Sequence, residues 1–388
     1  MQNILLSIIL PTRGRLETLK FTLSSLLKLD NPNIEIVICD NASEDGTDLY
    51  INNIQDPRIK YTKSDKKLTM PQNFERGLEI AKGDYILTLG DDDFIIQNNL
   101  DLALNSIIKS DSDIIYWNRW YFYWSSYPDS NNAGNFGISI GRQYFSIDTK
   151  LLLTLTYYGF VNFQYLPSIY NSIIKKSFLF KYKAHLRGRF FPDYVVAVDV
   201  YSSLIFSSLD PSTLYLESPV SVSGISHRSN GMSLYTDQKE YRKFLNELGL
   251  NESEELIPGN LVGKIKIINN SGRVALAVMI DYFNALEREL KFSMNSYPNL
   301  SLFTKKFITK FVINGDLEFT PNSIYLKDEF SKSNNIVNDD PITYFYNIFS
   351  IPSPTLYTGK FNNCEATSLD LFNHLQEINF NLNDQVKK

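Results

Sequence analysis

The chain reaches its first strand-like stretch almost at once, in Leu5-Leu6-Ser7-Ile8-Ile9-Leu10, and Pro11-Thr12-Arg13 follows directly. A nearly continuous apolar run is typical of a parallel strand that is covered on both faces of its sheet. Leucines then recur at helical spacing over residues 16–27, and Asn31-Pro32 closes that element. The opening of the chain therefore predicts a strand that leads into a helix.

The same alternation continues along the chain. Strands are predicted at residues 34–39, 59–62 and 85–89, with helices beginning near residue 47 and covering residues 71–81. Four strands separated by three helices predict an α/β fold with a doubly wound, mostly parallel, Rossmann-like sheet. Ligands of such sheets bind beyond the carboxyl ends of the strands, so the residues after each strand form the candidate site.

Bulk properties narrow the class of protein. A chain of 388 residues exceeds what one hydrophobic core usually organises, so we expect more than one domain. The formal net charge of -5 argues against nucleic acid as a partner and requires any phosphate site to be built locally. Cys39 and Cys364 are too few for a disulfide framework, and there is no signal-peptide pattern or apolar stretch of membrane-spanning length. These features predict a cytoplasmic protein.

Polar residues follow three of the predicted strands and should converge on one crevice. They are Pro11-Thr12-Arg13, Asp40-Asn41-Ala42-Ser43 and Asp91-Asp92-Asp93. Three adjacent carboxylates repel each other when ionised, so a divalent cation, Mg²⁺ or Mn²⁺, that bridges a diphosphate is their natural partner. An extended backbone would place Asp91 and Asp93 on one face. The alternative is a solvated acidic turn, or a cap for the helix beginning near residue 97.

Asp40 directly follows a predicted strand and can accept a hydrogen bond from the N–H edge of a nucleotide base. The alternative for residues 40–47 is a polar turn in which Ser43 caps the next helix and Asp45 interacts with the helix dipole. Both interpretations can hold together.

These segments, taken with Gly83-Asp84-Tyr85-Ile86, resemble the family-2 glycosyltransferases in their order and spacing. The resemblance implies an inverting enzyme with the GT-A fold. It also implies that Pro11, Thr12 and Arg13 line the base pocket, that Asp40 accepts from the base, and that Asp91 approaches the ribose. The aspartate triplet would hold the metal ion on the donor diphosphate.

Two departures from the family pattern leave assignments open. The commonest pattern has an aspartate where this chain has Gly90, so either Asp92 or Asp93 is the metal ligand. Many members carry Ala-Arg-Asn where Asn73-Phe74-Glu75-Arg76 stands here, and Asn73 is the candidate substitute for nucleotide binding. Arg76 is the other candidate, or else a solvent-facing residue paired with Glu79 or Glu75.

The family usually supplies an Asp or Glu general base near the start of a later helix. Asp193, in Arg189-Phe190-Phe191-Pro192-Asp193-Tyr194, fits this role, with Asp199 as its rival. The alternative for Asp193 is a helix N-cap. His227, in a segment that follows a strand-like stretch, resembles a family histidine that contacts metal or diphosphate, and Arg228 could neutralise phosphate. The alternative is a polar surface loop.

The remaining sequence predicts the domain division. Residues 1–125 form the nucleotide-sugar-binding half of the GT-A domain, residues 126–234 the acceptor-binding half, and residues 235–388 an appended, mainly helical region. The aromatic stretch at residues 116–124 contributes to the core, with one ring expected to contact a sugar. The C-terminal region could recognise the acceptor, pair two subunits, or contact the inner face of a membrane through Lys305, Lys306 and Lys310 beside phenylalanines, unless that helix packs on its own core.

The function predicted in this way is metal-dependent transfer of a hexosyl or N-acetylhexosaminyl group. The donor is a nucleotide-sugar, with UDP favoured, and the acceptor is a glycan or lipid-linked sugar of bacterial surface polysaccharide synthesis. The competing classes are a sugar-1-phosphate nucleotidyltransferase, a dinucleotide-binding oxidoreductase and a binding-only protein of the same fold. Residues 11–15 lack both the glycine-rich basic loop of the first and the Gly-x-Gly-x-x-Gly of the second.

Overall fold

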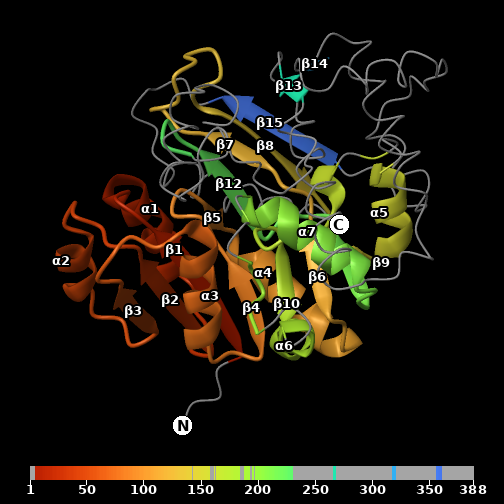
Figure 1. The fold of residues 1–388 in the computed structure, drawn as a ribbon, viewed down its shortest axis with the longest axis horizontal. Coiled ribbons are helices and arrows are strands. Elements are labelled where there is room, and N and C mark those ends of the chain that lie inside the picture. Colours follow the sequence, from red (N-terminus) through yellow and green to blue (C-terminus); the bar gives the residue numbers. More distant parts are fainter. Residues whose placement is uncertain are drawn as a thin grey trace, which may run out of the picture.

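The computed structural model describes residues 5–141, 143–157, 161, 163–183, 188–192, 195, 197–229, 265–267, 317–319 and 355–360. Its largest sheet has eight strands in the order β3-β2-β1-β4-β10-β6-β11-β9 (Figure 1). The strands of this sheet are β1 (Leu6–Thr12), β2 (Ile34–Asp40), β3 (Ile59–Lys63), β4 (Tyr85–Thr88), β6 (Ile114–Trp117), β9 (Tyr144–Ser146), β10 (Ser172–Lys175) and β11 (Thr213–Leu216).

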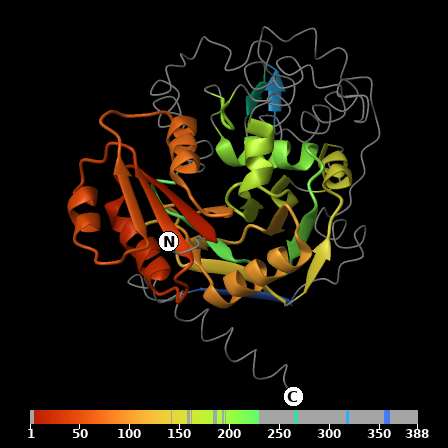
Figure 2. The ribbon, with the colours of Figure 1, turned by 90° about the horizontal axis from the view of Figure 1, so that it is seen from below.

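Helices cover both faces of this sheet, as Figure 2 shows from below. Apolar strand residues alternate between two clusters, so that Ile8 and Ile36 face one side while Ile9 and Val37 face the other. The first cluster contains residues of α1 (Leu16–Leu27), α2 (Thr47–Asn52) and α4 (Gln97–Ser110). The second contains residues of α3 (Met70–Ile80), α5 (Thr149–Tyr157), α6 (Lys176–Lys183) and α7 (Val198–Ser208).

The N-terminal strands pair as the sequence predicts. β1 is parallel to β2 and to β4, and β2 is parallel to β3, with the intervening helices α1, α2 and α3. α3 begins where it does because the Thr69 side chain accepts from the Gln72 N–H and the Gln72 side chain accepts from the Thr69 N–H. The prediction of a doubly wound, mostly parallel α/β sheet is confirmed.

The second half of the domain is built differently. β10 is antiparallel to both β4 and β6, while β11 returns parallel to β6. A second sheet, in the order β15-β8-β7-β12-β5, lies across the first at the carboxyl ends of its strands (Figure 1). Its strands are β5 (Phe94–Ile95), β7 (Tyr121–Tyr123), β8 (Asn135–Ile140), β12 (Ser221–Ile225) and β15 (Thr355–Lys360).

The aromatic stretch at residues 116–124 is divided between the two sheets. β6 carries Tyr116 and Trp117 into the first sheet, and β7 carries Phe122 into the second. Each of these three side chains is buried, as is that of Trp124. Core packing, the role expected for most of these rings, is confirmed for these four.

Part of residues 235–388, the region predicted to be mainly helical, is described as strands. β13 (Ile265–Ile267) pairs with β14 (Leu317–Phe319), and β15 adds to the second sheet through antiparallel pairing with β8. The region is therefore not wholly an appendage, because β15 is an edge strand of the second sheet. Lys305, Lys306 and Lys310 lie outside the described residues. The two boundaries between the three predicted domains remain predictions. Within the described ranges, no helix has both the length and the apolar character needed to cross a membrane.

Candidate functional site

The three predicted segments meet at the carboxyl ends of β1, β2 and β4. Thr12 Oγ1, at the end of β1, donates to Asp91 Oδ2 at 2.8 Å, although the two residues are 79 positions apart. On the other side of β1, Asn41 N, just past β2, donates to Thr12 O at 2.9 Å. Pro11 and Arg13 flank Thr12 and are partly buried. The convergence expected from the strand order is thus present in the structure.

Arg15, which the sequence did not single out, holds the first aspartate of the triplet. Its Nη1 lies 2.9 Å from Asp91 Oδ1, and it also donates to the carbonyl oxygen of Arg228. Although burial lowers the pKa of Arg15, the Asp91 and Asp92 carboxylates raise it well above its ordinary value. Arg15 therefore supplies a fixed positive charge at the point where the triplet begins.

Asp92 is held by the segment that follows β12. Its Oδ2 accepts from Ser229 Oγ at 2.7 Å and from Ser226 Oγ at 3.0 Å, and its carbonyl oxygen accepts from Trp124 Nε1 at 3.1 Å. Burial raises the pKa of the Asp92 carboxyl, Arg15 opposes this rise, and Asp91 adds to it. A buried carboxyl group with one guanidinium nearby is thus short of positive charge.

Asp93 points away from Asp91. Its Oδ2 accepts from Gly90 N and its Oδ1 from Gly224 N, each at 2.8 Å. Burial and repulsion from Asp92 raise the pKa of Asp93 to about 7. A Cβ at Gly90 would lie 2.8 Å from Asp93 Oδ2, so this conformation needs glycine where the family pattern has aspartate.

The expectation that Asp91 and Asp93 share one face is wrong. It assumed an extended backbone, but β4 ends at Thr88 and residues 91–92 form a turn in which Asp93 N donates to Gly90 O at 3.2 Å. The turn directs Asp91 toward Arg15 and directs Asp93 back toward the backbone of residues 90 and 224. The alternative of a solvated acidic turn is also wrong, because all three side chains are buried.

Asp40 is fully buried at the end of β2. Its Oδ1 accepts from Ser43 N at 2.8 Å and its Oδ2 from Tyr61 OH at 2.7 Å. Burial and the hydrogen bond to Asp40 raise the pKa of Tyr61. Ser43 does not cap α2, since its hydroxyl accepts from Gly14 N at 2.8 Å, while Asp45 accepts from Leu16 N at 2.8 Å. The turn after β2 therefore also holds the loop after β1, because Ser43 and Asp45 accept hydrogen bonds from the backbone N–H groups of residues 14 and 16.

Two residues of α3 donate hydrogen bonds to the backbone at Asp40. Asn73 Nδ2 donates to Cys39 O at 3.0 Å, and Arg76 Nη2 donates to Asp40 O at 2.8 Å and to Asn73 Oδ1 at 2.9 Å. Arg76 is therefore a partly buried residue of this network, and the alternative of a solvent-facing pair with Glu79 or Glu75 is wrong.

A partly buried cation, Arg119, interacts electrostatically with Asp93 of the triplet. The Arg119 guanidinium lies 5.9 and 5.5 Å from the ring centroids of Tyr121 and Tyr170, and its Nη1 is 2.7 Å from Asp199 Oδ2. One oxygen of Asp199, the rival base, is thus committed to Arg119. Asp193 lies outside the described residues, although Phe190, Phe191 and Pro192 before it are described.

His227 is exposed, on the segment that carries Ser226 and Ser229. Arg228, beside it, donates from Nη1 to Gly14 O at 2.7 Å, so this segment packs against the loop after β1. Among the residues that the structure describes, no group of three or more His, Cys, Asp or Glu side chains is arranged to hold a metal ion. His227 is consequently not brought together with Asp92 and Asp93 as a ready-made site.

A cavity of about 570 Å³ lies at the other end of the sheet, away from every predicted site residue. Lys82, Gly83, Lys176 and Phe180 are among the residues that line it. We assign the functional site to the carboxyl ends of the strands, since the buried polar network lies there and the cavity contains none of it.

Comparison with known proteins finds similarity over the part of the chain that contains β1, β2, β4 and the aspartate triplet. The family described as "Glycosyl transferase family 2" matches residues 7–173 of this chain. The UDP-Glc:alpha-D-GlcNAc-diphosphoundecaprenol beta-1,3-glucosyltransferase WfgD of Escherichia coli is 30% identical over 118 residues, 30% of this chain and 47% of that protein. Abequosyltransferase RfbV of Salmonella typhimurium is 35% identical over 121 residues, 30% of this chain and 36% of that protein.

The chain thus spans about half the length of these curated relatives, or less. Among solved structures, the crystal structure of S. aureus TarS 1-349 in complex with UDP-GlcNAc is similar at a TM-score of 0.45 and 15% identity, over 79% of this chain and 80% of that chain.

Proposed function

We propose that this chain, whose residues 7–173 match glycosyl transferase family 2, transfers a sugar from a nucleotide-sugar to a glycan or lipid-linked acceptor with inversion at the anomeric carbon. UDP is the favoured carrier and a hexosyl or N-acetylhexosaminyl group the favoured sugar. One relative is named for UDP-Glc as donor and a diphosphoundecaprenol-linked sugar as acceptor, which supports a role in bacterial surface polysaccharide synthesis.

One observation carries this proposal. Thr12, Arg15, Asp40 and Asp91 lie at or just beyond the ends of three different strands. They are buried or partly buried and are linked directly or through backbone contacts in one network. Buried polar groups are costly unless they are hydrogen-bonded, so a cluster of them at the ligand-binding end of an α/β sheet indicates a built site. A nucleotide-sugar suits this site, since it offers a base, a ribose and a diphosphate in sequence.

Asp40 is proposed to read the base. Each of its carboxylate oxygens already accepts one hydrogen bond, and a carboxylate has about four acceptor positions, so it can accept another from a base N–H. Asn73, with Arg76, fixes the backbone on either side of the Cys39–Asp40 peptide. Pro11, Thr12 and Arg13 line the same pocket in this proposal, and Asp91 approaches the ribose.

A divalent cation, Mn²⁺ or Mg²⁺, fits the aspartate triplet chemically. Such ions prefer carboxylate oxygen, and Mg²⁺ is often bound by one or two protein carboxylates together with substrate phosphates. Asp92 and Asp93 are adjacent, buried and short of positive charge, which matches a site completed by the donor diphosphate. When bound, the cation would offset the charge that develops on the departing diphosphate. His227 is proposed to contact the metal or the diphosphate from the segment that holds Asp92.

Asp193 is the proposed general base. It takes the proton from the acceptor hydroxyl while that oxygen attacks the anomeric carbon from the face opposite the diphosphate. The bond from the anomeric carbon to the diphosphate oxygen breaks, and the nucleoside diphosphate leaves with the bonding electrons. Asp199 is the rival, but its contact with Arg119 suits it better to fixing that cation.

Turnover of sugar nucleotides tests the proposal. Release of nucleoside diphosphate would be measured with UDP-glucose, UDP-N-acetylglucosamine and GDP-mannose, with Mn²⁺ or chelator, and with or without a diphosphoundecaprenol-linked sugar. We expect metal-dependent release from a UDP-sugar, stimulated by acceptor, and a product of inverted configuration by NMR. Binding of the nucleotide without turnover of any donor would instead indicate a binding-only protein, and formation of a nucleotide-sugar from a sugar phosphate would indicate a nucleotidyltransferase.

A further inference from the structure

Glu75 is a buried carboxylate that the proposed mechanism does not use. It lies in the middle of α3 and is 6% exposed. Glutamate is almost never buried unless its charge is paired and hydrogen-bonded. Its position therefore calls for an explanation.

Among the described residues, the Glu75 carboxylate contacts Lys183, Phe190 and Phe191, all in the second half of the domain. Its Oε1 accepts from Phe191 N at 2.6 Å and from Phe190 N, and its Oε2 lies 2.9 Å from Lys183 Nζ, at the end of α6. Two backbone donors and one ammonium thus converge on a single carboxylate, more than 100 positions away in sequence. Hydrogen bonds to an ionised acceptor are stronger than those between neutral groups.

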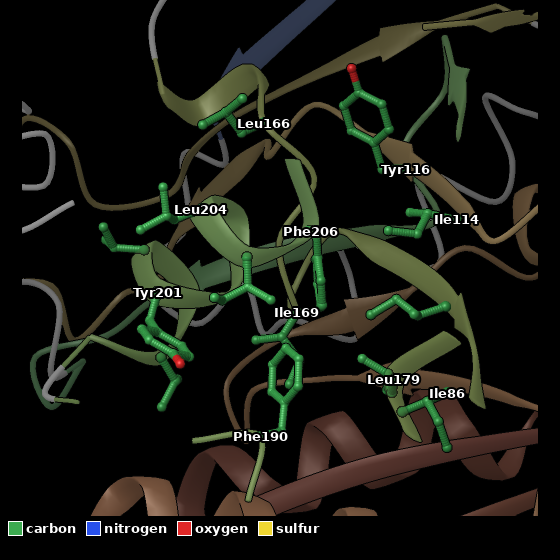
Figure 3. Close-up of a cluster of buried hydrophobic side chains, with 14 of the residues drawn as sticks. Ile86, Ile114, Tyr116, Leu166, Ile169, Leu179, Phe190, Tyr201, Leu204 and Phe206 are labelled. Atoms are coloured by element: carbon green, nitrogen blue, oxygen red, sulfur yellow. The ribbon is translucent and has the colours of Figure 1, made fainter. Parts of the chain in front are cut away.

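The peptide that Glu75 holds is anchored on its other side as well. The Phe190 and Phe191 side chains are each 1% exposed, and their rings lie 5.6 Å from Phe206 and 5.9 Å from Phe74. Figure 3 shows Phe190 directed into the cluster that contains Ile169 and Phe206. Side-chain packing and backbone hydrogen bonds together leave this segment little freedom.

Asp193, the proposed general base, comes two residues after Phe191. The intervening Pro192 has a fixed φ, which limits the conformations between the held segment and Asp193. Pro192 O also accepts from Val195 N at 3.0 Å, so the described residues on either side of Asp193 are hydrogen-bonded to each other. Glu75 thus holds the described backbone that directly precedes Asp193 in the sequence.

The same helix also contacts the nucleotide side. Asn73 and Arg76, which flank Glu75, donate to the carbonyl oxygens of Cys39 and Asp40. α3 therefore joins the residue proposed to read the base to the segment that precedes the proposed base catalyst.

We propose that Glu75 is a positioning residue that fixes the segment leading to Asp193 relative to the donor site. This inference rests on the function proposed above. Glu75 itself touches no reacting atom in this account, and its effect on the reaction is exerted through the backbone of Phe190 and Phe191.

Two double variants separate this role from simple stabilisation. In Glu75→Gln with Lys183→Met, the amide oxygen still accepts the two N–H groups. In Glu75→Met with Lys183→Met, the acceptor is gone while side-chain length is kept. Both remove the buried ion pair, a replacement that proteins often tolerate. Glu79→Gln is the matched control, since Glu79 lies one turn along α3, approaches the same Lys183 at 3.7 Å, and is 65% exposed.

The measurements are donor hydrolysis or transfer, the dissociation constant of the nucleoside diphosphate, and hydrogen exchange of the peptide containing Phe190 and Phe191. We expect the Met pair to have a kcat about 10–100-fold below that of the Gln pair, because misplacement of a reacting group by about 1 Å has costs of this size. The nucleotide dissociation constants should agree within about twofold, and only the Met pair should lose amide protection. Glu79→Gln should match the wild type.

Equal kcat values in the two double variants would overturn the positioning role, as would parallel losses of kcat and nucleotide affinity in the Met pair. A Met pair that does not fold, beside a Gln pair that folds and keeps wild-type kcat, would also overturn it and assign Glu75 to stability. A wild-type protein that turns over no sugar nucleotide would overturn the proposed function, and this inference with it.

Discussion

The two halves of the domain reach the same site by different routes. In the N-terminal half, β1, β2, β3 and β4 run parallel, and each polar segment of the site follows directly from a buried strand. In the second half, parallel and antiparallel pairs are mixed, and the strands are divided between two sheets. The first half thus presents its site residues by position along the strands, while the second contributes through long-range contacts.

This difference matters because residues of the second half donate hydrogen bonds to buried carboxylates of the first half. Ser226 and Ser229 donate to Asp92, and Gly224 N donates to Asp93. The backbone N–H groups of residues 190 and 191 donate to Glu75. The buried carboxylates of Asp92 and Asp93 are therefore in direct contact with β12 and with the segment that follows it.

The largest expected effect is a loss of kcat, without a loss of nucleotide affinity, when the proposed general base is replaced. Asp193→Asn should lower kcat by about 10²–10⁴-fold, the usual contribution of a general base, without changing nucleotide affinity. Asp199→Asn should have a smaller effect, because its carboxylate pairs with Arg119. Steady-state turnover with calorimetric nucleotide binding measures both. If the Asp199 variant loses more turnover than the Asp193 variant, the assignment of the base must be reversed.

Gly224 tests whether the second half shapes the triplet. A methyl group at this position would overlap the Asp92 carbonyl oxygen and Trp124 Nε1, so the strand or the triplet must move. We expect Gly224→Ala to lower the free energy of unfolding by about 1–3 kcal/mol, as overpacking does, and to weaken nucleotide binding. Gly188→Ala is the control, since a Cβ there meets nothing within 4 Å, although its φ of +82° still adds some strain. Unchanged nucleotide affinity in Gly224→Ala would make the two halves independent.

Asp40 tests the donor half alone. Asp40→Asn should weaken binding of the nucleoside diphosphate about 10–100-fold, since hydrogen bonds to a charged acceptor contribute about 1.5–3 kcal/mol. Asp48→Asn is the control on the neighbouring helix, where Asp48 forms a partly exposed pair with Lys63. Titration calorimetry at equal metal concentration compares them. Equal affinities of the two variants would remove Asp40 from base recognition.

The last test concerns the pH dependence of stability. Burial and Asp92 raise the pKa of Asp93 from 3.8 to about 7, so the folded protein holds this proton more tightly than the unfolded chain does. The resulting stabilisation is fully present below pH 3.8 and is lost as the pH rises toward 7. The free energy of unfolding of the wild type, relative to Asp93→Asn, should therefore fall over this range without divalent cation. Urea unfolding of both proteins at several pH values measures the difference, and a constant difference would contradict it.

Much of the donor half follows from the order of residues. Thr12, Asp40 and Asp91 could be placed because each follows a predicted strand, and parallel strands end at the same edge. The conformation of the triplet could not be placed, because the prediction assumed an extended backbone where Gly90 permits a turn. Glycine before three aspartates is the signal that would have favoured a turn.

Contacts between residues far apart in the sequence could not be predicted from local sequence patterns. Arg15 contacts Asp91 across 76 positions, and Ser226 contacts Asp92 across 134. Glu75 lies next to Phe74, which packs in the core, yet nothing in the sequence predicts that residues 190–191 supply its hydrogen-bond donors. Such pairings depend on how the two sheets meet, which a single sequence does not specify.

The most direct test of a metal-assisted donor site is calorimetric binding of UDP, GDP and TDP, each with Mn²⁺ and with chelator. The wild type would be compared with the variant Asp91→Ala, Asp92→Ala, Asp93→Ala, with its folded state checked by circular dichroism. We expect UDP to bind most tightly, only with Mn²⁺, and to lose that binding in the folded triple variant. A folded wild-type protein that binds none of the three nucleotides in a metal-dependent way would contradict the donor-site account.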